Sequence, residues 1–187
     1  MFRRSLFQKL VVLIVLLSVN SVNIIILGLP FFKSEPHHYF CKGHDGKWST
    51  CSKQYICTNQ LTKNEYRPDT TDEYYIENWT EQVNLICESK SRIGFLGASY
   101  FIGVIFATAI IPIGYLSDLY GRKWVFVFTN FSEIIACNGF IQATSLDQLY
   151  IYMFILGMGH PGRVIVAINY GYEFITEKQM EYLMPML

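Results

Sequence analysis

The sequence is poor in charged residues and carries no net charge. Only 16% of its 187 residues are Asp, Glu, Lys or Arg, against about 25% in an ordinary soluble domain. Fifteen basic and fifteen acidic side chains cancel, so no overall charge attracts the chain to nucleic acid. The sequence also lacks a nucleophile with a matching base, a metal-ligand cluster and a phosphate-binding loop. It therefore predicts no enzyme, and neither a metal nor another cofactor.

Long apolar runs are what the sequence has in abundance, since 51% of its residues are hydrophobic. Four such runs cover residues 10–32, 93–117, 124–142 and 149–168. Each is close to the roughly 20 residues that a helix needs to cross a bilayer core of about 30 Å. The sequence thus predicts an all-α, multi-pass integral membrane protein with four transmembrane helices in contact with lipid.

The first run also has features of a secretory signal peptide. It starts with the basic segment MFRRSLFQK, continues with apolar residues and has small residues at Ser18 and Ser21. The apolar run nevertheless extends to residue 32, beyond the 7 to 15 apolar residues of a signal peptide. We therefore favour a transmembrane helix.

Basic residues predict the orientation of these helices. Cytoplasmic loops are enriched in Lys and Arg, and here bases precede the first run while Arg122 and Lys123 separate the second from the third. Both signals place the N-terminus, the segment 114–124 and the tail 169–187 in the cytoplasm. Residues 33–92 then form a large extracellular loop.

Four of the five cysteines lie in this polar loop, at Cys41, Cys51, Cys57 and Cys87. An even set in an exported loop predicts two disulfides, with three possible pairings. The alternatives are free thiols or a metal site that includes His37, His38 and His44, although the cysteine spacing fits no common zinc pattern.

The loop also contains a glycosylation sequon, Asn78-Trp79-Thr80. The sequon lies on the same predicted side of the membrane as the cysteines. The sequence therefore predicts a glycoprotein with a disulfide-stapled extracellular loop.

The segment GYLSDLYGRKW, residues 114–124, breaks the apolar pattern between the second and third runs. Glycine permits close packing and positive φ angles, which we expect at Gly114 and Gly121. Arg122 and Lys123 are explained by a basic cytoplasmic turn, but Gly114 and Asp118 are not. The spacing of these five residues resembles the signature loop between helices two and three of the major facilitator superfamily of transporters.

Other segments resemble the organic cation, anion and carnitine transporter branch of that superfamily. They are the four-cysteine loop, the sequon running on to Leu85-Ile86-Cys87-Glu88, and the Gly- and Phe-rich second helix. The fourth run adds three glycines, Gly157, Gly159 and Gly162, and the tail after it adds a Tyr-x-x-Glu pattern at Tyr170 and Glu173.

The resemblance implies a twelve-helix carrier of small organic ions, whose two six-helix halves rock around a central site. Asp118 and Arg122 would then latch the cytoplasmic gate, and Glu173 would join their charge network. The chain departs from the branch at Leu119, Met153 and Met180, where arginines are common.

The resemblance covers the N-terminal third of such a carrier. The chain stops at EYLMPML, about where a fifth helix would begin. We therefore expect either a fragment of a transporter or a chain completed by other membrane subunits. The alternative is a transporter-derived structural subunit of a larger complex in the plasma membrane or an organelle membrane.

Ionisable and polar groups at membrane depth are expensive and mark candidate sites. Glu133 lies near the middle of the third run, where Asn130 and Cys137 share its helix face. His160 and Arg163 lie one turn apart around Pro161 in the fourth run, and we expect this proline to kink the helix.

These groups, with Asn20 and Asn23 of the first run, are candidate residues of a solute cavity. The alternative is that they form interhelical pairs, such as Arg163 or His160 with Glu133, or Asn20 or Asn23 with Glu133. The first run has no acid, so we expect facilitated transport that is not coupled to protons.

Overall fold

The structure is a computed structural model that describes residues 6–36, 38–43, 46–72 and 75–173. Four helical stretches in it are long and apolar enough to cross a membrane: Leu6–Phe32, Lys90–Ile110, Arg122–Gln142 and Leu146–Tyr172. The four expected membrane helices are therefore present. The chain divides into two compact units, which are described in turn.

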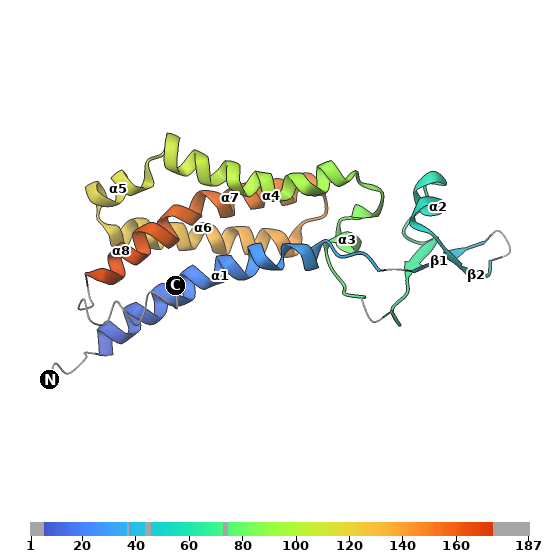
Figure 1. Cartoon of the computed structure of the whole chain (residues 1–187), viewed down its shortest axis with the longest axis horizontal. Helices are drawn as coiled ribbons and strands as arrows, with labels where there is room; N and C mark the ends of the chain where they lie inside the picture. Colours follow the sequence, from blue (N-terminus) through green and yellow to red (C-terminus); the bar gives the residue numbers. More distant parts are fainter. Residues whose placement is uncertain (1–5, 37, 44–45, 73–74, 174–187) are drawn as a thin grey trace. The chain divides into compact units, whose positions relative to one another are not determined.

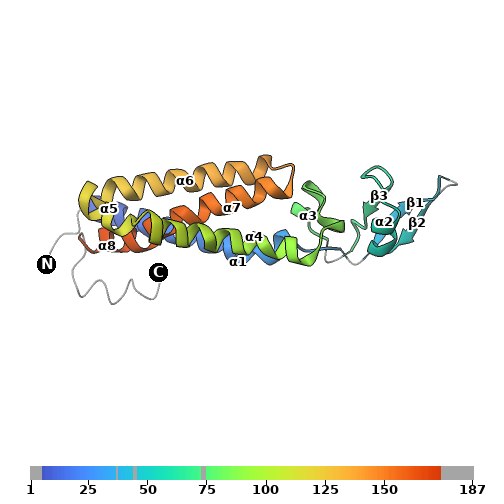
Figure 2. The same ribbon diagram turned by 90° about the horizontal axis from the view of Figure 1, so that it is seen from above.

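The first unit, here called the helical unit, comprises Met1–Leu27, Phe95–Gln142 and Asp147–Leu187. It contains most of α1 (Leu6–Phe32), α4 (Lys90–Ile105), α6 (Arg122–Gln142) and α7 (Leu146–Pro161). Figures 1 and 2 show α6 and α7 side by side in both views. Near one end of the unit, Val15 and Val19 of α1 pack against Phe126 of α6 and Ala167.

Glycines on α4 and along the fourth span bring the backbone of the fourth span against two other helices. A Cβ on Gly157 of α7 would lie 2.0 Å from the carbonyl oxygen of Tyr100 on α4. A Cβ on Gly103 of α4 would lie 2.3 Å from the carbonyl oxygen of Phe154 on α7. Further along, a Cβ on Gly162 would lie 2.3 Å from Thr129 Cγ2 of α6. Because lipid gives little hydrophobic drive for helix association, such close approach supplies the packing contacts instead.

The second membrane span is broken, whereas the sequence predicted one continuous helix over 93–117. After α4 come a π-helical segment, η2 (Phe106–Ile110), and a separate helix, α5 (Ile113–Tyr120). Pro112 is the reason, because it has no N–H to donate and forces the preceding residue out of the helical region. Ile111 accordingly has φ −111° and ψ 85°.

The fourth span continues through its proline. The helical path runs from α7 through the π-helical segment η3 (Gly162–Val166) to α8 (Ala167–Tyr172). It is therefore longer than the predicted 149–168. The π-helical segment directly follows Pro161, where the missing N–H disturbs the regular hydrogen-bond ladder.

The second unit, here called the loop unit, comprises Gly28–Gly94 and Ala143–Leu146. It contains a three-stranded antiparallel sheet in which β1 (Tyr39–Lys42) lies between β2 (Trp48–Cys51) and β3 (Tyr66–Pro68). The short helices are α2 (Lys53–Thr58), α3 (Trp79–Gln82) and the 3-10 turn η1 (Leu85–Cys87). An all-α description thus fits the membrane helices but not this loop.

Two disulfides staple the loop unit, as the sequence predicted. Cys41 pairs with Cys51 between β1 and β2, and Cys57 pairs with Cys87 between α2 and η1. Tyr39, Ile56 and Ile86 form the small core between them. The disulfides leave no thiolate on these four residues for a metal. Cys137 is the free cysteine of the described part of the chain.

The two disulfides should contribute unequally to the stability of the loop unit. They close loops with sequence separations of 10 and 30 residues. The entropy lost by the unfolded chain grows with loop length, so removing Cys57–Cys87 should destabilise more than removing Cys41–Cys51, by about 1 kcal/mol. Urea titrations of the two double Ser variants, followed by Trp48 and Trp79 fluorescence, measure this. Equal midpoints would contradict the expectation.

Candidate functional site

A single residue, Gly121, separates α5 from α6. Its φ is +91°, a value that side chains with a Cβ rarely adopt, so glycine is required for so short a connection. Residues 114–120 are consequently helical, and the predicted motif loop over 114–124 is reduced to this one turn. Gly114 is different, because its φ is not positive and a Cβ there would meet nothing within 4 Å. The expected close packing at Gly114 is thus not made by the described residues.

Arg122, the first residue of α6, joins three elements of the helical unit. Its Nη1 lies 3.1 Å from Glu173 Oε1 and donates to the Asn169 carbonyl oxygen of α8 at 3.2 Å. Its Nη2 lies 3.8 Å from Asp118 Oδ1 of α5. We call Asp118, Arg122 and Glu173 the Arg122 cluster. It lines a pocket of about 430 Å³ together with Tyr170 and Lys123.

The Arg122 cluster is too exposed to be a major source of stability. The Asp118 and Glu173 side chains are 70% and 49% exposed, and surface ion pairs contribute about 0 to 1 kcal/mol. Asp118 makes the weaker contact of the two, and the described residues provide no other partner for its carboxylate. The cluster therefore leaves an accessible acid at the end of the bundle.

A second arginine–glutamate pair lies inside the bundle. Arg163 of η3 is fully buried, and its Nη1 lies 2.9 Å from Glu133 Oε2 of α6. Its Nη2 donates to the Leu156 carbonyl oxygen at 2.7 Å, while Nε and Nη1 make no hydrogen bond within the described ranges. Of the alternatives that the sequence left open for Glu133, the structure forms the pair with Arg163.

His160, one turn before Arg163, has a different partner. Its Nδ1 lies 2.7 Å from the hydroxyl of Tyr100 on α4, and the two rings meet edge to face. Tyr100 was not singled out from the sequence. The available signal was its position one helical turn before Gly103, on the face of α4 that meets α7.

The polar residues of α1 do not join Glu133. Asn20 is exposed, and its amide donates to the Leu16 carbonyl oxygen of its own helix at 2.9 Å. Asn23 is half-buried and makes no hydrogen bond to the described part of the chain. Instead Ser18, which the sequence offered only as a small residue of a signal-like segment, donates to Asn130 Oδ1 of α6 at 2.6 Å.

The sequon residue Asn78 is part of the loop unit's own structure. Its Oδ1 accepts from the Thr80 N–H and so caps α3, while its Nδ2 donates to the carbonyl oxygens of Phe31 and Ser34 at 3.1 and 2.7 Å. Nδ2 is the atom that would carry a sugar. Glycosylation at Asn78 stays a prediction, and it would replace one donor of this network.

Four apolar spans, glycine-mediated packing and paired charges between helices define a polytopic membrane protein. A family model, described as the Major Facilitator Superfamily, matches residues 11–180. The chain therefore belongs to the Major Facilitator Superfamily, a superfamily of membrane transporters and not of enzymes. A search among curated proteins finds no match.

Removing one charge of the buried Arg163–Glu133 pair should destabilise the helical unit. Glu133→Gln leaves the Arg163 guanidinium buried without a balancing charge, and such changes cost about 3 to 5 kcal/mol. Thermal unfolding in detergent should show the loss. The exposed acid Glu77 gives a matched control, since Glu77→Gln should leave the midpoint unchanged.

The double variant Glu133→Gln, Arg163→Met makes this test specific to the pair. Because both charges are gone, it should recover most of the stability that Glu133→Gln loses. A double variant as unstable as the single one would show that the ion pair is not the source of the loss.

Proposed function

We propose that this chain forms the gate-bearing part of a carrier for small organic ions that works by alternating access. The observation that carries the proposal is the Arg122 cluster, placed between α5, α6 and α8 in a member of a transporter superfamily. In this proposal the cluster and the N-terminus face the cytoplasm. The loop unit, with its two disulfides, faces the outside.

The geometry of α5 supports a latch. Gly114 and Asp118 are four residues apart and so share one face of the helix. The space beside Gly114 is open, and the Asp118 carboxylate is mostly exposed. A second helical domain can thus approach the backbone at Gly114 and place a base, or the positive N-terminus of a helix, against Asp118.

Arg122 completes the latch by tying α5 and α8 to the start of α6. When the second domain engages Asp118, Arg122 keeps its shorter contact with Glu173 and the cytoplasmic end stays closed. When the second domain withdraws, Asp118 is left with the 3.8 Å contact alone. The cluster then biases the gate between two arrangements of similar energy, which is what alternation requires.

The buried pair supports facilitated transport without proton coupling. Proton-coupled carriers need a titratable group at membrane depth. Glu133 is one such group here, and its carboxylate is paired with Arg163. His160 is another, and its Nδ1 lies 2.7 Å from the Tyr100 hydroxyl. The Glu133–Arg163 pair also presents no net charge to a solute, and other groups must select the charge of the transported ion.

The latch can be tested by uptake of a panel of labelled organic cations, anions and zwitterions into proteoliposomes that hold the chain together with the second helical domain. Asp118→Asn should lower the initial rate of uptake about tenfold, the effect of 1.4 kcal/mol on the gate equilibrium. Glu77→Gln, which changes an acid in the loop unit, should have no effect. An unchanged rate with Asp118→Asn would contradict the latch.

If the protein is folded but takes up no solute of the panel, the result would favour the alternative function, a structural subunit. In that case the chain should migrate in native gels only as part of a larger complex. A free, folded monomer would contradict the structural subunit.

Proton coupling can be tested in the same proteoliposomes. Because Glu133 is held as one half of an ion pair, an inward proton gradient should leave the initial rate unchanged, and a protonophore should not slow uptake. Alkalinisation of a weakly buffered medium on solute addition would contradict facilitated transport. Glu133→Gln with Arg163→Met offers a control that has no titratable group at this position.

A further inference from the structure

A long apolar groove lies in the helical unit, between the broken second span and the faces of α6 and α7. Its volume is about 450 Å³. The lining includes Ile113 and Leu116 of α5, Phe128 and Ile135 of α6, and Met158 of α7. These five side chains are all apolar.

The two small hydroxyl side chains at the groove, Ser132 and Thr129, donate to carbonyl oxygens of their own helix. Ser132 Oγ donates to the Thr129 carbonyl oxygen at 2.7 Å, and Thr129 Oγ1 donates to that of Phe126 at 3.1 Å. Both bonds stay within α6. A cavity without free polar groups does not hold water, and at membrane depth the hydrocarbon of the bilayer is the material available to fill it.

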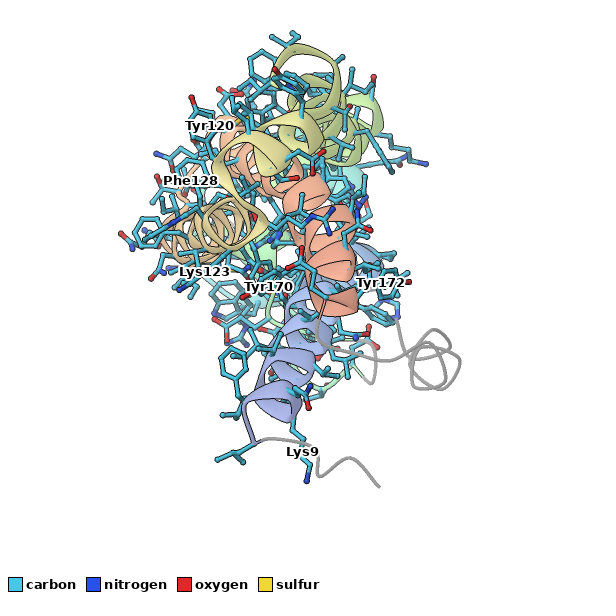
Figure 3. All side chains as sticks on the ribbon, turned by 90° about the vertical axis from the view of Figure 1, so that its left-hand side faces the viewer. Lys9, Tyr120, Lys123, Phe128, Tyr170 and Tyr172 are labelled. Carbon is cyan, nitrogen blue, oxygen red and sulfur yellow. A yellow bond between two sulfur atoms is a disulfide. The ribbon has the colours of Figure 1, made fainter. Side chains whose placement is uncertain are left out.

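The mouth of the groove carries the residue types found at a membrane surface. Tyr120 and Trp124 are both 67% exposed and Phe128 is 73% exposed, and all three line the groove. In Figure 3, Tyr120, Phe128 and Lys123 lie on the same side of the helical unit. Tyr and Trp favour the level of lipid headgroups, so this end of the groove lies at the membrane–water boundary.

Lys123 lines the pocket of the Arg122 cluster, and its positive charge lies next to this mouth. It precedes Trp124 in α6, and its Nζ lies 5.9 Å from the centre of the indole ring. Arg122 next to it is engaged by Glu173 and Asp118, whereas Lys123 is exposed and has no ion-pair partner among residues 6–173 that the structure describes. An unpaired lysine at a headgroup level attracts anionic lipid.

We infer that this groove binds an anionic phospholipid of the surrounding bilayer. One acyl chain fills the apolar groove under the break at Pro112, and the headgroup phosphate lies at Lys123, beside Tyr120 and Trp124. The charge on Lys123 selects anionic over zwitterionic lipid, while the groove itself accepts the chain of either. This inference depends on the membrane helices alone, not on the proposed transport activity.

Trp124 provides a direct probe, because bromine on an acyl chain quenches a nearby indole. The full chain with Trp48→Phe and Trp79→Phe keeps Trp124 as the one tryptophan of the three in the sequence. It is reconstituted in phosphatidylcholine with increasing fractions of dibrominated phosphatidylglycerol or, separately, dibrominated phosphatidylcholine. Half-maximal quenching should need about fivefold less of the anionic lipid, the effect of one lysine near an anionic headgroup.

Variants assign this preference to the site. Lys123→Gln should bring the two lipids to equal quenching, while Lys9→Gln should preserve the preference. Lys9 is the matched control because it is an exposed lysine on α1, which Figure 3 shows away from Tyr120, Phe128 and Lys123.

Three results would overturn the inference: equal quenching by both lipids with Lys123 present, a preference that persists in Lys123→Gln, or no quenching by either lipid. The last would mean that protein, such as another helix, covers the groove. Native mass spectrometry of the chain with all three tryptophans provides a second measurement. It should show phosphatidylglycerol retained in preference to phosphatidylcholine, and the reverse order would equally contradict the inference.

Discussion

The ion pair between Arg163 and Glu133 is the interaction on which the packing of the helical unit depends. A guanidinium away from water is tolerable only with a balancing charge and hydrogen-bond acceptors, and here Glu133 and the Leu156 carbonyl provide them. Room for the guanidinium comes from a glycine, since a Cβ on Gly159 would lie 3.3 Å from Arg163 Nη2. The glycines of α7 thus serve both close helix packing and the burial of this charge.

The Arg122 cluster and the buried pair are two levels of one arrangement. In the Arg122 cluster the arginine is on α6 and its partner, Glu173, follows α8. In the buried pair the order is reversed, because Glu133 is on α6 and Arg163 is on η3. Along α6, Arg122 and Glu133 are about three turns apart. Arg163 and Glu173 have a similar separation along the fourth span. A shift by one turn would separate both pairs, and the buried pair is the one that holds the register between α6 and the end of the fourth span. Sliding of these two helices past each other is therefore incompatible with keeping both pairs.

Sequence reasoning succeeded where the signal is local. Run length predicted the four spans, and an even set of cysteines predicted two disulfides, although not their pairing. Sequence reasoning failed where the structure depends on a break in the backbone or on a partner from another helix. Pro112 lies inside an apolar run and was overlooked, so α5 was not separated from α4. Glu133 was identified as costly to bury, but only the folded chain selects Arg163 over Asn20, Asn23 or His160. Tyr100 and Ser18 were missed because their role exists only across a helix interface.

The cap at Asn78 has a consequence for the order of events during synthesis. The amide nitrogen that a glycosyltransferase would modify is the same atom that holds the Phe31 and Ser34 carbonyls in the finished loop unit. Trp79 and Thr80 of the sequon are buried, so an enzyme can read this tripeptide only before the segment has folded. Sugar attachment at Asn78 would therefore have to precede the folding of this segment.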